Sequence, residues 1–326
     1  MKLCQYETNN GDKAIGLAIA DGEKIADLKQ VFQAVPTADQ AGYQVPSDLQ
    51  RLIEDGPAGL AAARAAENAL LGSPDLLGNP EAVFAADAVR LCAPVSRPPK
   101  FFAIAINTRH NWEKALKPEN PHATYFIKLA TCIVGPHDDV HIPDIGYVGS
   151  EVELAVIIGK GGRHIPEDKA LEHVFGYTVH NDITAHEMRK TTEWIQVKRP
   201  DGSEERLTYP GRYKNYDTFS PMGPWITTAD EAPDPNKVTL RAWLNDDLVQ
   251  EGSSADHVYG VAALISYLSD AHTLEPGDII STGTVPPKPP WTHPKIDLGR
   301  IGGVLTTRAD GFGELKNPIV FDEGVV

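Results

Sequence analysis

The sequence predicts a mainly β (α+β) protein with a small N-terminal domain and a larger second domain. Its 326 residues exceed the roughly 250 to 300 at which a single hydrophobic core stops growing, so one large domain plus a smaller one is expected. The 26 prolines and 28 glycines fall mostly between short apolar runs, where they mark turns and loops. Stretches with helical spacing are few. Together these observations favour a turn-rich chain dominated by strands.

The beginning of the chain alternates strand-like runs with turn dipeptides. Residues 3–7, 14–19 and 24–28 are the runs, and Asn10-Gly11 and Asp21-Gly22 separate them. Asn, Asp and Gly tolerate the positive φ that tight hairpin turns require. The pattern therefore predicts a small antiparallel meander.

Two short helices and a boundary are expected after the meander. Residues 49–71 are rich in Ala and Leu at helical spacings, and Gly56-Pro57 interrupts them. Residues 92–100 contain three prolines, which block both helix and strand ladder. We therefore place the domain boundary near residue 95, with a small domain at 1–95 and a larger one at 96–326.

The second domain is expected to be mainly β. Residues 101–106 form a continuously apolar run that ends at Asn107, as a strand buried on both faces would. Helical patterns are confined to residues 167–174, 184–190 and 257–268, where Ser253 and Ser254 are expected to cap the last helix. Further apolar runs, at residues 125–128, 154–158, 175–179, 225–227, 238–244 and 278–281, predict additional strands.

Charge and cysteine usage narrow the classes of partner. Forty-five acidic against thirty basic residues leave a formal charge of −15, which repels nucleic-acid phosphates and anionic lipid surfaces. The three cysteines are scattered without paired spacing, which is typical of a reducing compartment. Apolar runs are far shorter than the roughly 20 residues of a membrane span. The sequence predicts a cytoplasmic protein with small-molecule partners and neither nucleic acid nor membrane.

Glu151 and Glu153 begin the apolar run 151–159 and form the most informative motif of the chain. Successive side chains alternate across a strand, so these carboxylates point to the same side, roughly 7 Å apart at the backbone. At this spacing they can converge on one cation. The alternative is a solvated strand face, but the strand continues with apolar residues on both faces. Two acids at the start of a buried strand repel each other unless a cation or a basic side chain lies between them.

Asp182 supplies a third acid at the end of another apolar run, residues 174–179. It stands beside the two glutamates if the two strands are neighbours. Three carboxylate ligands with open positions suit Mg²⁺, Mn²⁺ or Ca²⁺ better than zinc. Asp182 could instead be the N-cap of a helix over 184–190. The spacing alone does not choose between ligand and cap.

His110 and Glu113 follow the apolar run 101–106. On a helical turn these two residues share a face, so Glu113 can orient the imidazole and raise its basicity. Such a pair could activate water. The simpler interpretation is an exposed loop histidine.

Several blocks, in this order along the chain, resemble the fumarylacetoacetate hydrolase family. The resemblance covers roughly residues 96–326 and is strongest at 151–160 and 174–182. The other matching blocks are residues 125–128, 214–225 and 274–284. This resemblance implies the family's mixed β-roll for the catalytic domain, preceded by a β-rich N-terminal domain.

The resemblance also implies the metal ligands and the catalytic groups. The family's Glu-x-Glu pair and later aspartate correspond to Glu151, Glu153 and Asp182, which would bind Mg²⁺ or Mn²⁺, with Ca²⁺ also compatible. Lys214 aligns with a lysine that faces the substrate. In short-chain members the catalytic histidine is the fourth residue after the asparagine that ends the first strand. Asn111 occupies that position here, while His110 and Glu113 keep the family's three-residue offset one step earlier. We interpret this as a one-residue deletion that preserves the dyad.

The expected substrate contacts are Arg109, Lys128, His186, Arg189 and Thr284, the last within the matching Thr-Gly-Thr stretch. Two of them depart from the family pattern. His186 and Arg189 stand where relatives carry arginine and glutamine, so altered specificity is expected. Residues 191–213 form a basic, aromatic segment that is longer than in many relatives. It would be either a lid over an anionic substrate or a solvated insertion at an oligomer interface.

The activity implied by the resemblance is metal-dependent hydrolysis of a carbon-carbon bond in a 1,3-diketo acid or acylpyruvate, as in aromatic catabolism. The metal would stabilise an enolate, and His110 would activate water. Because one enolate-stabilising site can serve several reactions, a decarboxylase, tautomerase or dehydratase remains an alternative. A catalytically silent metal-binding protein is another. Family dimers imply a homodimer.

Overall fold

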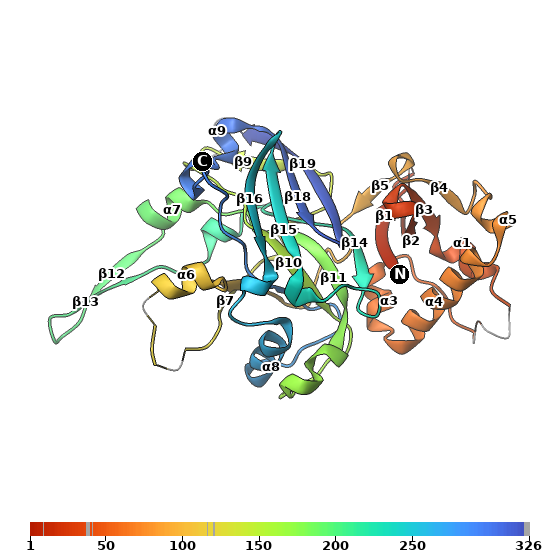
Figure 1. Ribbon diagram of the computed structural model, residues 1–326, viewed down its shortest axis with the longest axis horizontal. Coiled ribbons are helices and arrows are strands. Elements are labelled where there is room, and N and C mark those ends of the chain that lie inside the picture. Colours follow the sequence, from red (N-terminus) through yellow and green to blue (C-terminus); the bar gives the residue numbers. More distant parts are fainter. Residues whose placement is uncertain (9, 37–39, 41, 116, 120, 323–326) are drawn as a thin grey trace.

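The structure is a computed structural model that describes residues 1–322, apart from 9, 37–39, 41, 116 and 120. It consists mainly of strands with short helices, which confirms the mainly β prediction (Figure 1). The strands form a 12-stranded sheet, a 5-stranded sheet and a separate two-stranded hairpin. Within the described part of the chain, no helix is long and apolar enough to cross a membrane.

The N-terminal meander forms as predicted. Strands β1 (Lys2–Glu7), β2 (Lys13–Ile19) and β3 (Lys24–Asp27) pair antiparallel in chain order. The turn between β2 and β3 is a short 3-10 segment (Ala20–Gly22), in which Gly22 adopts a φ of 90°. Two further short strands, β4 (Val83–Ala85) and β5 (Arg90–Cys92), add to β3 and β1.

Helices cover this meander. The two predicted within residues 49–71 are α3 (Leu49–Glu54) and α4 (Pro57–Leu71). Gly56, at a φ of 59°, separates them, and Pro57 opens α4 at a position where its missing N–H costs nothing. The other helices of this region are α1 (Leu28–Gln33) and α5 (Pro74–Leu77).

The large sheet runs through both predicted domains. Strand β1 pairs antiparallel with β14 (Ser220–Thr228), so the order across the sheet is β4-β3-β2-β1-β14-β11-β10-β17-β6-β7. The remaining strands of this sheet are β6 (Phe101–Ala105), β7 (Thr124–Ile127), β8 (Ile133–Val134), β10 (Val152–Ile158), β11 (Val174–Asn181) and β17 (Ile279–Ser281). The boundary near residue 95 stays a prediction.

A second sheet packs against β10 and β11. Its order is β16-β15-β18-β19-β9. Its strands are β9 (Val140–Pro143), β15 (Thr239–Leu244), β16 (Asp247–Ser253), β18 (Gly303–Ala309) and β19 (Gly313–Asp322). Each apolar run predicted as a strand in the second domain thus coincides with a strand or extends at most one residue beyond it.

Strand β10 separates two hydrophobic cores. Leu154 and Val156 belong to the core between the two sheets, whereas Ala155 and Ile157 belong to a core that includes the N-terminal helices. This alternation covers both faces of β10, as its uninterrupted apolar sequence predicts. The N-terminal region therefore packs on the face of β10 from which Glu153 also projects, further along the strand.

The predicted helices of the second domain are shorter than expected. Residues 167–173 form a 3-10 helix (Glu167–His173), and α7 (His186–Thr191) replaces the helix expected at 184–190. The expected helix over 257–268 begins later, as α8 (Val261–Ala271). Its predicted start was wrong because Val258 and Tyr259 donate their backbone N–H groups to Asn107, which holds this backbone extended. Ser253 accordingly caps a separate 3-10 turn, Ser254–Asp256.

The other short elements connect these strands. They are α6 (Arg109–Lys114), α9 (Leu298–Ile301), the hairpin strands β12 (Ile195–Lys198) and β13 (Glu204–Leu207), and the 3-10 segments Ala86–Ala88, Ala130–Cys132, Arg212–Lys214, Pro235–Lys237 and His293–Lys295. In Figure 1 the hairpin β12–β13 projects on the side opposite the N-terminal region.

We expect Ile157→Ala to destabilise the protein by about 2–5 kcal/mol, because it opens a cavity in the core that β10 shares with the N-terminal helices. The same substitution at Ile195, which is 63% exposed, should change stability by less than about 0.5 kcal/mol. Denaturant unfolding of both variants measures the difference. Equal losses would contradict a tightly packed core at Ile157.

Candidate metal centre and cavity

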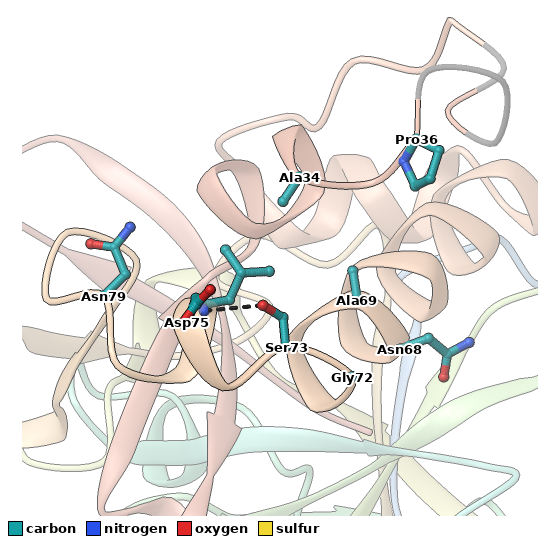
Figure 2. A pocket seen from close by; sticks show the side chains of 9 residues that line it. Ala34, Pro36, Asn68, Ala69, Gly72, Ser73, Asp75 and Asn79 are labelled. Carbon is teal, nitrogen blue, oxygen red and sulfur yellow. Dashed lines mark hydrogen bonds between the residues drawn. The ribbon is translucent and has the colours of Figure 1, made fainter.

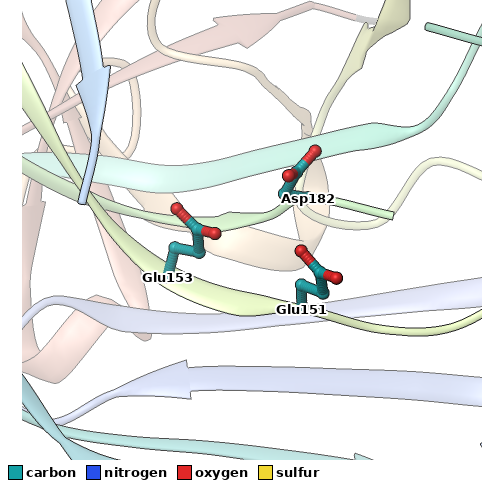
Figure 3. Close-up of side chains that lie close together, drawn as sticks. All are labelled: Glu151, Glu153 and Asp182. Carbon is teal, nitrogen blue, oxygen red and sulfur yellow. The ribbon is translucent and has the colours of Figure 1, made fainter. Parts of the chain in front are cut away.

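Three carboxylates meet where β10 and β11 end side by side. Glu151 directly precedes β10, Glu153 is the second residue of that strand, and Asp182 directly follows β11. The antiparallel register pairs Val152 with Asn181, and the Asp182 N–H donates to the Glu151 carbonyl. Carboxylate oxygens of the three acids lie within 4.8 Å of one another (Figure 3). The two separate sequence motifs therefore form one cluster.

The structure decides between the alternatives for Asp182. Helix α7 begins only at His186, its N-cap is Ala185, and no side chain caps it. Asp182 is therefore not a helix cap. Asp182 and Glu153 are both 1% exposed, so the solvated-face interpretation does not hold for this cluster either.

Two buried lysines partly compensate the carboxylates. Lys214 Nζ donates to Glu151 Oε2 at 2.8 Å and also contacts Asp182 Oδ2. Lys128 Nζ donates to Asp182 Oδ1 at 2.7 Å and to the Phe219 carbonyl at 3.0 Å. Two ammonium groups thus face three carboxylates, so one negative charge is left without a cation among these side chains. Glu153 is the acid that contacts neither lysine.

This arrangement moves the pKa values of the acids in opposite directions. Burial, together with the charge of Asp182, raises the pKa of Glu153 to about 8. Burial alone would raise the pKa of Asp182 as well, but the charges of Lys128 and Lys214 outweigh it and lower that pKa to about 2. The charges of Asp182 and Glu151 likewise raise the pKa of Lys214, although burial opposes them.

The donor set fits a hard divalent cation. All three acids offer oxygen atoms, they are close enough to share one ion, and their cluster carries an uncompensated negative charge. Oxygen-only ligand sets are those that Mg²⁺, Mn²⁺ and Ca²⁺ prefer. Glu151, Glu153 and Asp182 could therefore hold such an ion, which would displace the proton of Glu153.

The three carboxylates line a cavity of about 620 Å³ whose other walls are basic and aromatic. Four of the residues expected to take part in catalysis or substrate contact line it, namely Lys214, His186, Arg189 and Thr284. His186 stacks on Tyr147, and its Nε2 lies 3.6 Å from Glu151 Oε1. Burial lowers the pKa of His186 to about 4, so its ring is neutral at pH 7.

Helix α6 turns a different face to the cavity from the one predicted. Asn111 and Lys114 line the cavity, whereas His110 and Glu113 are exposed and lie outside its lining. The His110 ring contacts Lys114 Nζ at 2.9 Å, and within the described chain no hydrogen bond joins it to Glu113. In this arrangement of α6 the pair is not brought to the carboxylates, and its catalytic role stays a prediction.

The two other expected substrate contacts also lie elsewhere. Lys128 is buried behind Asp182, with donors committed to that carboxylate and to a backbone carbonyl. Arg109 is exposed at the start of α6, outside the cavity lining. Lys128 thus pairs with the Asp182 carboxylate, and Arg109 lies on the surface.

Sequence reasoning missed several residues of the cavity. Lys114 is three residues after Asn111 and shares its helix face, and Lys190 directly follows the predicted Arg189, so both carried a local signal. His293 and Tyr147 carried none, because long loops bring them to the cavity from distant parts of the chain.

The basic segment 191–213 places few of its charges near the cavity. Lys198 pairs with Glu204 and Arg199 with Glu205 on the hairpin β12–β13, and Arg206 stacks on Trp194. Thr208, Pro210 and Tyr213 are the residues of this segment that line the cavity. The choice between lid and oligomer interface stays open.

A second hollow, of about 580 Å³, lies in the N-terminal region between α1, α4 and α5 (Figure 2). Its lining consists of small and amide side chains, and Asp75 is the one ionisable residue in it. A single carboxylate, with no second ionisable side chain in this lining to pair with it, forms neither a catalytic pair nor a metal-ligand set. The chemistry of the protein is therefore expected at the carboxylate cluster.

The fold and the site define a class: a mixed-sheet protein with an acidic cluster that could bind a divalent metal inside a basic small-molecule cavity. The sequence model of the fumarylacetoacetate (FAA) hydrolase C-terminal domain matches residues 100–320. The chain belongs to the fumarylacetoacetate hydrolase family, as its motifs predict.

Relatives extend over nearly the whole chain. The mitochondrial oxaloacetate tautomerase fahd2 of Xenopus laevis is 31% identical over 322 residues, which cover 98% of this chain and 90% of that protein. The maleylpyruvate hydrolase of Sphingobium sp. SYK-6, solved with manganese(II) and pyruvate, is 29% identical with a TM-score of 0.71, covering 99% of this chain and 100% of its own. A fumarylacetoacetate hydrolase from Exiguobacterium antarcticum is 27% identical with a TM-score of 0.73 at the same coverage.

The structures confirm the family fold over the full chain, including the N-terminal region. The relatives are enzymes, yet they comprise both hydrolases and a tautomerase. Family membership therefore does not fix the reaction.

We expect Mn²⁺ binding at pH 7 to release protons, because Glu153 has a pKa of about 8 and must be ionised to act as a ligand. Below pH 8 protons compete with the metal, so affinity should rise by up to about tenfold per pH unit from pH 6 and level off above pH 8. Calorimetric titrations in two buffers with different ionisation enthalpies measure the release.

Glu153→Gln should abolish the proton release and weaken binding. Glu251→Gln, a matched change at an acid paired with Arg241 and Lys288, should leave both unchanged. Affinity that does not vary between pH 6 and 8 would contradict the raised pKa of Glu153.

Proposed function

We propose that this chain is a divalent-metal-dependent enzyme that hydrolyses a carbon-carbon bond in a 1,3-diketo acid of the acylpyruvate type. One observation carries the proposal: a single cavity joins the carboxylate cluster to the cationic side chains Lys114, Arg189, Lys190 and Lys214. The cluster suits a divalent cation, and the basic walls suit an acid substrate that binds beside it.

In this proposal each ligand and wall residue has a defined task. Glu151, Glu153 and Asp182 hold Mg²⁺ or Mn²⁺. When bound, the cation supplies Lewis-acid polarisation of the 2-oxo group and stabilisation of enolate charge. Lys214, whose ammonium lies against Glu151 and Asp182, adds positive charge where an oxyanion develops. Thr284 and Arg189 orient the substrate carboxylate.

Hydrolysis also requires a base for water. His110, oriented by Glu113, is the proposed base, and it must then enter the cavity by a movement of α6. The helix is only six residues long, and no side chain caps its N-terminus, so few local contacts fix the face that it presents.

Keto-enol tautomerisation of oxaloacetate is the second candidate. The observation that favours it is the position of His110 and Glu113 outside the cavity. Tautomerisation moves a proton without consuming water, so it needs no activated water. His186, neutral and with an unpartnered Nε2 in the cavity, is then the candidate for the proton transfer. The Xenopus relative, named for this activity, supports the same choice.

We also propose that the enzyme is cytoplasmic and acts on small molecules. Its acidic surface and its three free, buried cysteines support this proposal. The homodimer stays a prediction from the family.

The first test is a spectrophotometric assay of metal-free protein with a panel of acylpyruvates, with and without Mg²⁺ or Mn²⁺. We expect metal-dependent loss of the enol-diketone absorbance, with pyruvate and a carboxylic acid as products. Asp182→Asn should abolish the metal-dependent rate, whereas Asp247→Asn, at an exposed site on β16, should not. Turnover of enol-oxaloacetate alone would favour the tautomerase, and release of CO₂ a decarboxylase.

His110→Ala separates the two candidates. If His110 activates water, the variant should hydrolyse acylpyruvates about 10² to 10⁴ times more slowly and bind Mn²⁺ unchanged. His164→Ala, a matched change at an exposed histidine, should have no effect. Unchanged turnover of His110→Ala would reject the His110–Glu113 dyad.

A further inference from the structure

Two buried residues behind the metal cluster have no part in the reaction proposed above. His180 Nδ1 lies 2.7 Å from Ser281 Oγ, and Ser281 Oγ donates to Glu153 Oε2 at 2.6 Å. We propose that His180 and Ser281 are positioning residues that fix the orientation of the Glu153 carboxylate and thereby set the affinity of the metal centre. This inference rests on the proposed metal site and names the groups that tune it.

Strand pairing places the three residues in a row. The strands β11, β10 and β17 are neighbours in the large sheet. Glu153 is the direct cross-strand partner of His180, and Ser281 pairs with Ala155, two residues further along β10. Paired residues, and residues two apart on one strand, project from the same face of a sheet. All three side chains therefore point to one face.

The single hydroxyl proton of Ser281 determines the direction of its hydrogen bonds with Glu153 and His180. A serine hydroxyl has one proton, and Ser281 uses it toward Glu153. Its oxygen then accepts from His180, so Nδ1 of the imidazole carries the hydrogen. The other nitrogen, Nε2, is buried and has no hydrogen-bond partner among the residues that the structure describes.

Packing alone does not account for a histidine at this position. His180 is fully buried, its ring meets Phe101 edge-on at 5.1 Å between centroids, and one of its nitrogens is unsatisfied. A buried polar atom without a partner is unfavourable, so an apolar residue would be more stable here. What an apolar residue cannot supply is the Nδ1–H donor to Ser281.

Glu153 depends on these donors more than the other two acids do. Glu151 and Asp182 are each held by a lysine ammonium, whereas among the described residues no ammonium contacts Glu153. Its Oε2 accepts from Ser281 and from the Gly283 backbone N–H at 2.8 Å. No described residue donates to Oε1. One oxygen is thus fixed by the protein while the other is left for a cation.

The test is Mn²⁺ affinity of the full chain, measured by calorimetry or by the EPR signal of free Mn²⁺. Ser281→Ala removes one of the two donors that hold Glu153, and we expect binding to weaken about 10- to 100-fold. Thr178→Val is the matched control. Thr178 is equally buried on β11 and loses one hydroxyl bond, to the Gly223 carbonyl, away from the cluster. Its affinity for Mn²⁺ should be unchanged.

A second pair of variants tests His180 itself. Asn can present an N–H near the position of Nδ1, whereas Leu fills a comparable volume without a donor. We therefore expect His180→Asn to bind Mn²⁺ as tightly as the unaltered protein does. His180→Leu should bind Mn²⁺ almost as weakly as Ser281→Ala. Because His180 acts through Ser281, the double variant His180→Leu/Ser281→Ala should bind no more weakly than Ser281→Ala alone.

Each outcome supports or overturns the inference. Unaltered affinity in Ser281→Ala, or equal weakening in Thr178→Val, overturns the positioning role while leaving the metal site intact. Failure of the unaltered protein to bind Mn²⁺ overturns both this inference and the proposed function. If Ser281→Ala does not fold, as judged by circular dichroism and thermal melting, the contrast between His180→Asn and His180→Leu decides.

Discussion

The antiparallel pairing of β10 with β11 is the interaction on which the site depends. Its register sets Val152 against Asn181, and the acids that flank this pair therefore share one end of the sheet. Because side chains alternate across a strand, a slip of one residue would send Glu153 to the opposite face. Both faces of β10 pack in hydrophobic cores, so the slip would bury the Glu153 carboxylate in the apolar core between the two sheets, away from the other two acids. The cost of burying that carboxylate among apolar side chains opposes the slip.

Bringing three acids together in a buried place creates a repulsion that the fold must offset. Lys128 approaches from the end of β7 and Lys214 from a 3-10 turn before β14, and both point at Asp182. The two lysines leave the charge of one carboxylate unpaired. Burial and the charge of Asp182 raise the pKa of Glu153 to about 8, so this acid is mostly protonated at pH 7. Binding of the proposed cation, loss of the Glu153 proton and the position of Lys214 would consequently be linked, because all three act on the carboxylate oxygens of the cluster. A substrate that contacted Lys214 would change the same charge balance.

Local patterns predicted those features that depend on neighbours in the sequence. The alternation in β10, the turn dipeptides of the meander and the Glu151–Glu153 spacing each specify structure within a few residues. Features set by distant contacts were not predictable. Helix α8 starts late because Asn107, far away in the sequence, holds the backbone before it, and no local signal reports this. The face of α6 is a similar case, since His110–Glu113 and Asn111–Lys114 have the same spacing and only the tertiary structure selects one pair.

The N-terminal region has a consequence for β10, β11 and β14 that lies outside the chemistry of the cavity. It covers β14 along one edge and packs on Ala155, Ile157 and Phe175 beside the site. A fragment that began at residue 96 would expose both an open strand edge and an apolar sheet face. These are the two surface features that drive self-association of β proteins. The first 95 residues therefore keep this strand edge and this apolar face of the rest of the chain out of contact with solvent.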